Sequence, residues 1–239
     1  MSKIYDKMIS LGLSIGDNEL GTDKDHWHSY IELLYPHVFD NIVPLDLVYE
    51  IGVWNKASLA LWKSSYPSAR VIGCDINLEL PTHPIASEMI KNGEIELLEG
   101  DPYENIDLLL ENISILIDDG PHTIASQKRA LDFRIKLAPH GILVIEDLVD
   151  LGGPVNCFYE LYKSINRSER KYCLAIDFSK NKSRLDDAVF IYTRDPKIFG
   201  VLSKELSEYI FTFKSIIHKK VKASFSYRLR KFLSLKFNS

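Results

Sequence analysis

The most restrictive feature of this sequence is a series of continuous apolar runs separated by stretches of helical pattern. The clearest helical stretch, residues 123–137, carries Ala130, Phe133 and Leu137 on one side. Apolar strands that alternate with helices are typical of a parallel sheet covered on both faces. Since the last two runs lie closer together, an antiparallel edge pair is expected there. We therefore predict an α/β fold with a mostly parallel, seven-stranded sheet, built from residues 45–53, 70–76, 94–101, 113–120, 141–148, 172–178 and 188–194.

The 239 residues suffice for one α/β domain with additional structure at its ends. We divide the chain into an N-terminal lead-in or cofactor lid (1–44), a Rossmann-like domain (45–195) and a basic, amphipathic C-terminal extension (196–239). The formal net charge of -4 gives no reason to expect nucleic-acid binding. Three widely spaced cysteines argue against a disulfide framework or a zinc site. Neither a signal peptide nor a long apolar span is recognisable, and we predict a cytoplasmic location.

Acidic residues end five consecutive predicted strands. In open α/β sheets, ligands bind outside the carboxyl ends of the strands. A single acid at such a place is explained equally well as the cap of the following helix. Acids at five strand ends along one edge favour a ligand-binding edge instead, and they are Glu50, Asp75, Asp101, Asp118 with Asp119, and Glu146 with Asp147.

Two neighbouring strand ends in this series bring several carboxylates together. The pairs Asp118-Asp119 and Glu146-Asp147 would repel each other, and a bound Mg²⁺ would remove that repulsion because it prefers oxygen ligands. His122 follows Asp119 by three residues, and an imidazole there is suited to accept a proton near neutral pH. The alternative is a histidine that only bonds to a neighbour at the start of a helix.

Motifs for two common nucleotide sites are absent from the sequence. There is neither a GxGxxG fingerprint nor a GxxxxGK[ST] loop, which argues against a nicotinamide dehydrogenase and excludes a P-loop. Asp75 ends the second predicted strand and is placed to accept hydrogen bonds from a ribose diol. Several families of nucleoside-binding proteins share that feature, so it does not choose between them.

Several segments resemble one family of class I methyltransferases, which includes the macrolide sugar O-methyltransferases of the mycinamicin and tylosin pathways. The resemblance covers roughly residues 20–150, and the pair ILIDDGPH and GILVIEDL is its most specific part. The lead-in segment GTDK, with His28 and Tyr30, adds to it. The other segments that carry it are VYEIGVWNKASLALW and VIGCDI.

The resemblance implies S-adenosylmethionine and Mg²⁺ as cofactors and a sugar or similar vicinal diol as the methyl acceptor. It implies that His122 is the general base and that Asp119, Glu146 and Asp147 hold the metal. The residues that it assigns to the cofactor are Glu50 and Gly52 at the pocket edge, Asp75 on the ribose, Asp101 near the adenine, and Thr22, Asp23 and Lys24 as residues that close over cofactor or substrate.

One departure from the family pattern concerns Lys56 and Ala57, which stand where relatives have glycines. A lysine there can point outward, pair with the methionine carboxylate or obstruct the pocket. Two alternative functions therefore stay open. One is a degenerate methyltransferase fold that binds without catalysis. The other is a metal-dependent enzyme of another reaction type, such as a hydroxylase. A non-haem iron enzyme needs two histidines and a carboxylate, whereas His122 is the only histidine that we expect near the acids. We interpret most of the other histidines as surface or local hydrogen-bonding residues.

The C-terminal tail is basic after Glu208, with aromatic and aliphatic side chains interleaved. Such a segment can lie on an anionic membrane or bring the enzyme to a lipid-linked glycan. The alternative is a terminal helix that packs on the domain or on a second subunit of a homo-oligomer.

Overall fold

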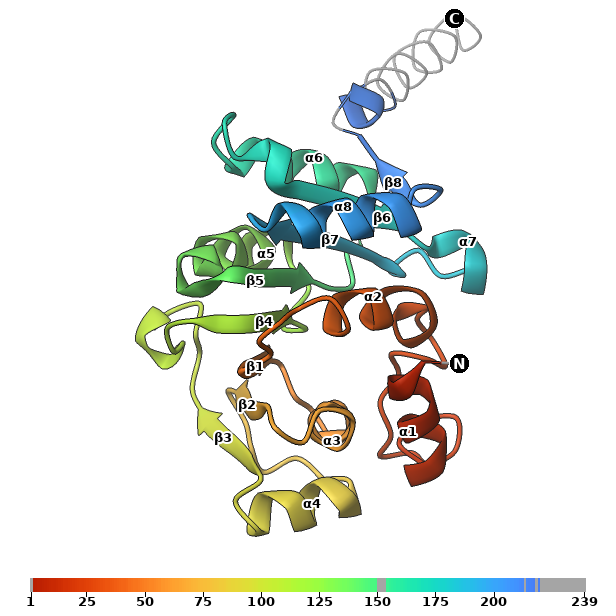
Figure 1. The fold of residues 1–239 in the computed structure, drawn as a ribbon, viewed down its shortest axis with the longest axis vertical. Helices are drawn as coiled ribbons and strands as arrows, with labels where there is room; N and C mark the ends of the chain where they lie inside the picture. The colour runs from red at the N-terminus through yellow and green to blue at the C-terminus, as the bar shows by residue number, and fades with distance from the viewer. Residues whose placement is uncertain (1, 150–153, 213, 218, 220–239) are drawn as a thin grey trace, which may run out of the picture.

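A computed structural model describes residues 2–149, 154–212, 214–217 and 219 (Figure 1). A single sheet lies at its centre, and in the described part of the chain this sheet has eight strands in the order β3-β2-β1-β4-β5-β7-β6-β8. The strands are β1 (Leu47–Ile51), β2 (Arg70–Asp75), β3 (Ile95–Glu99), β4 (Ile113–Asp118), β5 (Leu137–Ile145), β6 (Cys173–Asp177), β7 (Ala188–Thr193) and β8 (Ile210–Phe211).

Strands β1 to β5 pair in parallel, whereas β7 lies antiparallel between β5 and β6. This is the Rossmann-like arrangement of the class I methyltransferase fold, so the predicted fold class is confirmed. The prediction of seven strands missed β8, which spans only two residues beside β6 and is too short to produce an apolar run. The order of the strands reverses between β1 and β4, and such a switch point is where open α/β sheets form their ligand crevice.

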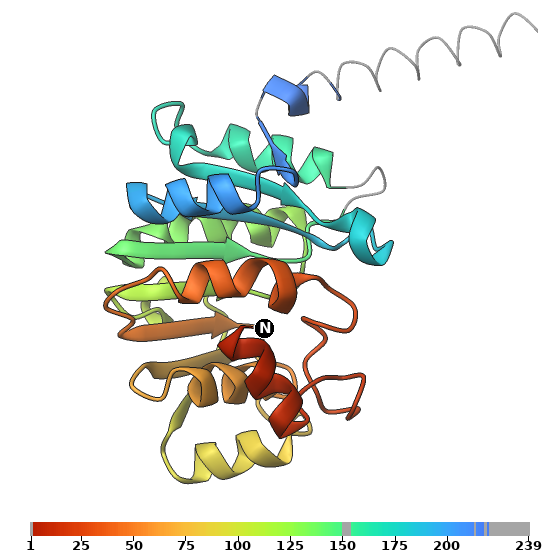
Figure 2. The same ribbon diagram turned by 45° about the vertical axis from the view of Figure 1, so that its right-hand side comes forward.

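Helices cover both faces of this sheet (Figures 1 and 2). Contacts among α1, α2, α3, α4 and α8 place these helices on one face, and α5 packs with α6 on the other. Each face has its own cluster of buried apolar side chains. The helices are α1 (Lys3–Leu11), α2 (Tyr35–Phe39), α3 (Ala57–Ser65), α4 (Pro84–Lys91), α5 (Ile124–Ala130), α6 (Val155–Ser164), α7 (Ser179–Lys182) and α8 (Pro196–Glu205), with the π-helix η1 (Tyr30–Leu34) and the 3-10 turns η2 (Ile106–Leu108), η3 (Leu131–Lys136) and η4 (Arg170–Tyr172).

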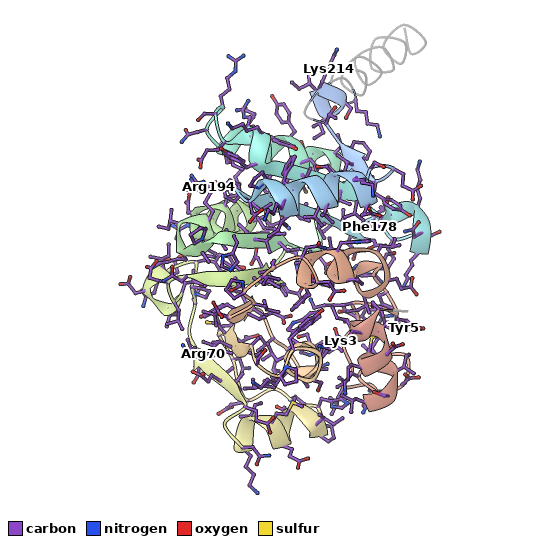
Figure 3. The ribbon with its side chains drawn as sticks, in the orientation of Figure 1. Lys3, Tyr5, Arg70, Phe178, Arg194 and Lys214 are labelled. Carbon is purple, nitrogen blue, oxygen red and sulfur yellow. The ribbon has the colours of Figure 1, made fainter. Side chains whose placement is uncertain are left out.

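The described part of the lead-in, residues 2–44, contributes to the core of the domain. Met8 of α1 and Leu34 of η1 are fully buried in the same cluster as Val48 of β1. At the start of α1, the Lys3 ammonium lies 4.6 Å from the ring centroid of Tyr66, next to the end of α3 (Figure 3). The segment is therefore a structural layer as well as a neighbour of the sheet edge.

At the other end of the chain, the boundary that we placed at residue 195 falls before two elements of the fold. Helix α8 packs against β7 and α2, and β8 extends the sheet beside β6. Within the described residues, no helix is both long and apolar enough to cross a membrane. The basic residues beyond Lys219, on which the membrane and oligomer predictions depend, lie outside the described part of the chain.

The expected single helix over residues 123–137 has a different structure. Thr123 begins α5 with a reciprocal capping box to Ser126, and the helix ends at Ala130. The chain continues as the 3-10 turn η3, and Leu137 already belongs to β5. Ala130, Leu131 and Phe133 are buried across the junction of the two segments, so the spacing of these side chains does not distinguish an α-helix from a 3-10 turn.

Candidate active site

A cavity of about 430 Å³ opens at the carboxyl ends of the parallel strands. Its walls come from the segments that follow β1, β2, β3 and β4, including residues 100–103 and 119–122, and from two single residues, Asp23 and Asp147. The cavity therefore lies at the switch point between β1 and β4, where ligands are expected. Among the predicted site residues, those that line the cavity are Asp23, Gly52, Asp75, Asp101, Asp119, His122 and Asp147. Those that do not line it are Thr22, Lys24, Glu50 and Glu146.

Asp119, His122 and Asp147, which we call the outer triad, meet at one end of this cavity. One potential ligand atom of each lies within 4.8 Å of the others. The His122 Nε2 atom is 3.7 Å from Asp119 Oδ1 and 3.8 Å from Asp147 Oδ2. His122 and Asp147 both have a left-handed backbone conformation, with φ of 53° and 51°. Residues other than glycine rarely adopt it, and such positions cluster at functional sites.

Two further acids lie beneath the outer triad, together with a buried lysine. Glu50 and Glu146 are fully buried, and the Lys24 ammonium lies between them and Asp119. Its Nζ is 2.7 Å from Asp119 Oδ2 and 3.4 Å from Glu50 Oε1, and it also donates to Glu146 Oε2. We call Glu50, Glu146 and Lys24 the inner cluster. Asp119 joins the two groups, because it belongs to the outer triad and accepts a hydrogen bond from Lys24.

Electrostatics at Lys24 favour its charged form. Burial opposes charge on the ammonium, but Asp119, Glu146 and Glu50 outweigh this effect and hold the pKa of Lys24 well above its ordinary value. Desolvation also raises the pKa of Glu50. The pKa of Asp119 is lowered: burial would raise it, but Lys24 and His122 overcome that tendency. The sequence pattern did not predict this arrangement, because it requires contact between the lead-in and three strand ends.

Aromatic side chains complete the hydrogen bonding of the inner cluster. Tyr35 Oη donates to Glu146 Oε1, and Trp62 Nε1 donates to Glu50 Oε2 at 2.7 Å. The two rings also pack on each other, with centroids 4.8 Å apart. Because buried carboxylates require partners, these bonds hold both acids in one orientation.

The prediction that His122 is the only histidine near the acids is wrong. His28 is buried, and its Nδ1 lies 3.4 Å from Asp147 Oδ1. Its ring stacks on Tyr30, whose hydroxyl donates to Asp147 Oδ1 at 2.8 Å. Burial lowers the pKa of His28 to about 4, so this imidazole is neutral at neutral pH. The only sequence signal for these two residues was the resemblance of the GTDK segment with its histidine and tyrosine.

Asp118, the other acid of the Asp-Asp pair, belongs to neither group. It is buried and accepts a hydrogen bond from the Tyr103 hydroxyl. Burial raises the pKa of Asp118 to about 7. Tyr103 itself lines the cavity, so Asp118 supports the cavity wall from behind.

Lys56 does not obstruct the cavity. Its backbone is left-handed with φ of 64°, the conformation that glycine adopts most readily, yet the side chain is buried. The ammonium donates to the carbonyl oxygens of Leu78 and Leu80 at 3.2 and 3.0 Å. Since Leu80 lines the cavity, these two hydrogen bonds from Lys56 stabilise the backbone of one cavity wall.

The Asp75 carboxylate binds backbone N–H groups from the segments that follow β1 and β2. Its Oδ2 accepts the Val53 N–H at 2.9 Å, and its Oδ1 accepts the Asn77 N–H at 3.0 Å. Each carboxylate oxygen has a second acceptor position, so a ribose diol can still bond to it.

No family model matches this sequence, and no curated protein does either. Among solved structures, the TDP-rhamnose 3'-O-methyltransferase CalS11 of calicheamicin biosynthesis is 15% identical, with 81% of this chain and 93% of that chain covered and a TM-score of 0.48. The methyltransferase PaMTH1 of Podospora anserina, with S-adenosylhomocysteine bound, is 13% identical over 81% and 88% of the two chains, with a TM-score of 0.45. A spermidine synthase is 11% identical over 74% and 65%, with a TM-score of 0.49. At such identities the likeness concerns the fold, which hosts more than one reaction.

Proposed function

We propose that this protein is an S-adenosylmethionine-dependent O-methyltransferase whose acceptor is a sugar or a similar vicinal diol. The observation that carries the proposal is the outer triad, which places an imidazole between two carboxylates at one end of the switch-point cavity. The proposal adds a reaction to the fold on the basis of residues at the site.

The cavity wall offers what a nucleoside cofactor requires. Asp75 presents free acceptor positions for a ribose diol, and Trp54, Ile76 and Leu80 supply apolar surface for a flat base. Gly52 brings backbone to the wall, with φ of 78°. Lys56 is bonded elsewhere, so the replaced glycine does not fill the pocket. These features fit S-adenosylmethionine, with Asp101 at the adenine side.

The outer triad also fits a divalent cation. Asp119 and Asp147 each direct one carboxylate oxygen toward His122, and this side of the cluster is partly exposed. The two carboxylates would hold Mg²⁺, and the ion, when bound, would lower the pKa of an acceptor hydroxyl. His122 would accept the hydroxyl proton at Nε2, which is the role that its position beside the cavity supports.

An exposed aromatic side chain one turn from the cavity residue Asp23 suits a sugar acceptor. Trp27 follows Asp23 by one turn and is 40% exposed. The Arg184 guanidinium lies 5.5 Å from its ring centroid and pairs with Asp186 through two bonds. An indole face can pack against the apolar face of a sugar ring, while the charged groups bond to its hydroxyls.

The first experiment is calorimetric titration of S-adenosylmethionine into the protein, with Mg²⁺ and then with EDTA. Binding at one site per chain, followed by Mg²⁺-dependent methylation of a panel of sugar diols, is the expected result. The His122→Ala variant should keep cofactor binding and lose methylation. If wild-type protein binds no S-adenosylmethionine in either condition, the methyltransferase proposal fails. Binding without methylation of any diol would instead favour a binding protein on this fold.

The location of the protein and its partners stay predictions. A cytoplasmic location, the absence of nucleic-acid partners, a homo-oligomer and a peripheral membrane contact through the basic tail all depend on residues or partners beyond the described structure.

A further inference from the structure

Lys24 is a charged side chain in an unusual environment. It is 2% exposed, and three carboxylates from the ends of β1, β4 and β5 surround its ammonium. Leaving a buried charge without a partner is strongly destabilising, so the acids and the lysine depend on each other. The sequence had suggested a metal ion for this place, because acids at adjacent strand ends repel.

The hydrogen bonds of Glu146 show how the ammonium competes with a metal. Its Oε2 accepts from Lys24, and its Oε1 accepts from the Tyr35 hydroxyl. Both oxygens are therefore engaged, on a side chain that is fully buried. A metal ion on Glu146 would lie beside the Lys24 ammonium, and the two positive charges would repel each other. Glu146 is also absent, among the described residues, from the group whose ligand atoms converge.

Asp119 has a different arrangement. Its Oδ2 accepts from Lys24 at 2.7 Å, whereas its Oδ1 lies toward His122 at 3.7 Å. One oxygen thus belongs to the inner cluster, and the other faces the cavity. The bond from Lys24 fixes which oxygen is presented to a ligand.

We propose that Lys24 is a built-in cation that takes the place of a metal ion in the inner cluster, so that any divalent cation binds only at the outer triad. In this arrangement Glu146 is a counter-ion of Lys24 rather than a metal ligand, and Lys24 is a positioning residue for Asp119. The part that concerns metal selection rests on the proposed function, whereas the part that concerns charge balance does not.

Charge balance is tested by urea unfolding in EDTA, where no metal contributes. Lys24→Met should raise the unfolding equilibrium constant about 100-fold or more, because it leaves buried carboxylates without their cation. Adding Glu146→Gln removes one of those charges at nearly constant shape, and the double variant should recover at least about tenfold. Glu146→Gln alone should be destabilising. If the double variant is as unstable as the two single effects combined, the built-in cation is refuted.

Metal selection is tested by measuring Mn²⁺ binding with electron paramagnetic resonance, on protein in which Lys24 is intact. Glu146→Gln should leave the dissociation constant within about twofold, and Asp147→Asn should weaken binding by about tenfold or more. Equal losses in the two variants would make Glu146 a ligand and overturn the inference. If wild-type protein binds no Mn²⁺, the metal part of the proposed function fails by itself, and the unfolding cycle still decides the role of Lys24. If neither Lys24 variant folds, the comparison of Mn²⁺ binding between Glu146→Gln and Asp147→Asn decides whether Glu146 is a counter-ion or a metal ligand.

Discussion

Replacing Gly52 with alanine should destabilise the protein far more than replacing another glycine of the same backbone conformation. Gly52 follows β1 with φ of 78°, and its amide donates to the Cys74 carbonyl at 2.9 Å. A methyl group at this position would overlap the carbonyl of Asp119, since it would lie 2.7 Å from the carbonyl carbon. The clash therefore falls on the backbone of an outer-triad residue.

The expected cost has two parts. A left-handed backbone costs an alanine about 1–2 kcal/mol relative to glycine. Relief of the overlap requires a shift of backbone that is itself bonded, because the Asp119 amide donates to Ile51 at 2.9 Å. Overpacking of this kind costs about 1–3 kcal/mol. Gly52→Ala should therefore lower the free energy of unfolding by roughly 2–5 kcal/mol.

Gly93→Ala is the matched control, because Gly93 has φ of 73° and no heavy atom within 4 Å of the added methyl. It should show only the backbone cost of about 1–2 kcal/mol. Urea denaturation of both variants at one pH measures the difference, and Mn²⁺ binding should weaken in Gly52→Ala alone. Equal destabilisation of the two variants would refute the contact between Gly52 and Asp119 as the source of the effect.

Three further substitutions probe the surroundings of the cavity by urea unfolding. His83 caps α4 by accepting the Ile85 N–H, and burial lowers the pKa of its imidazole, so the free energy of unfolding should fall as the pH drops below about 6.5. His83→Asn keeps a capping side chain and should make the free energy of unfolding less dependent on pH in this range. An unchanged pH dependence would show that His83 is not its source. Lys56→Met removes both bonds to the 78–80 segment and should cost about 1–2 kcal/mol, whereas no loss would mean that those bonds are not formed. Asp187→Ala leaves the buried amide and hydroxyl of Ser29 without their acceptor and should cost about 3 kcal/mol, with a loss below 1 kcal/mol contradicting the observed bonds.

The sequence predicted the sheet because its evidence is local. The central parallel strands β1 and β4 are buried throughout and consist mainly of apolar residues, and β4 ends at the Asp118-Asp119 pair as expected. The acids of neighbouring strands were correctly expected at one edge, since parallel strands place their carboxyl ends together. The short strand β8 and the break between α5 and η3 leave no distinct pattern, so neither was predicted.

Contacts between distant segments account for what the sequence did not predict. Asp118 and Asp119 are adjacent, yet one bonds to Tyr103 and the other to Lys24, and periodicity does not say which. His28 comes to Asp147 only because the lead-in crosses the sheet edge. The strand ends alone therefore predicted that these acids meet at one edge of the sheet, but they did not predict that a lysine balances part of the charge there.

Charge balance links the lead-in to the chemistry of the sheet edge. The sheet brings Glu50 and Glu146 into its interior, and neither can remain charged there without a cation. The lead-in supplies that cation through Lys24 and a donor through Tyr35, and it buries its own apolar side chains against the same face. The same contacts that stabilise the fold also orient the Asp119 carboxylate. The geometry of the outer triad is therefore set when the protein folds, before any ligand binds. A site built in this way needs no metal to assemble, and in the proposed function a divalent cation at the outer triad would be free to serve the acceptor.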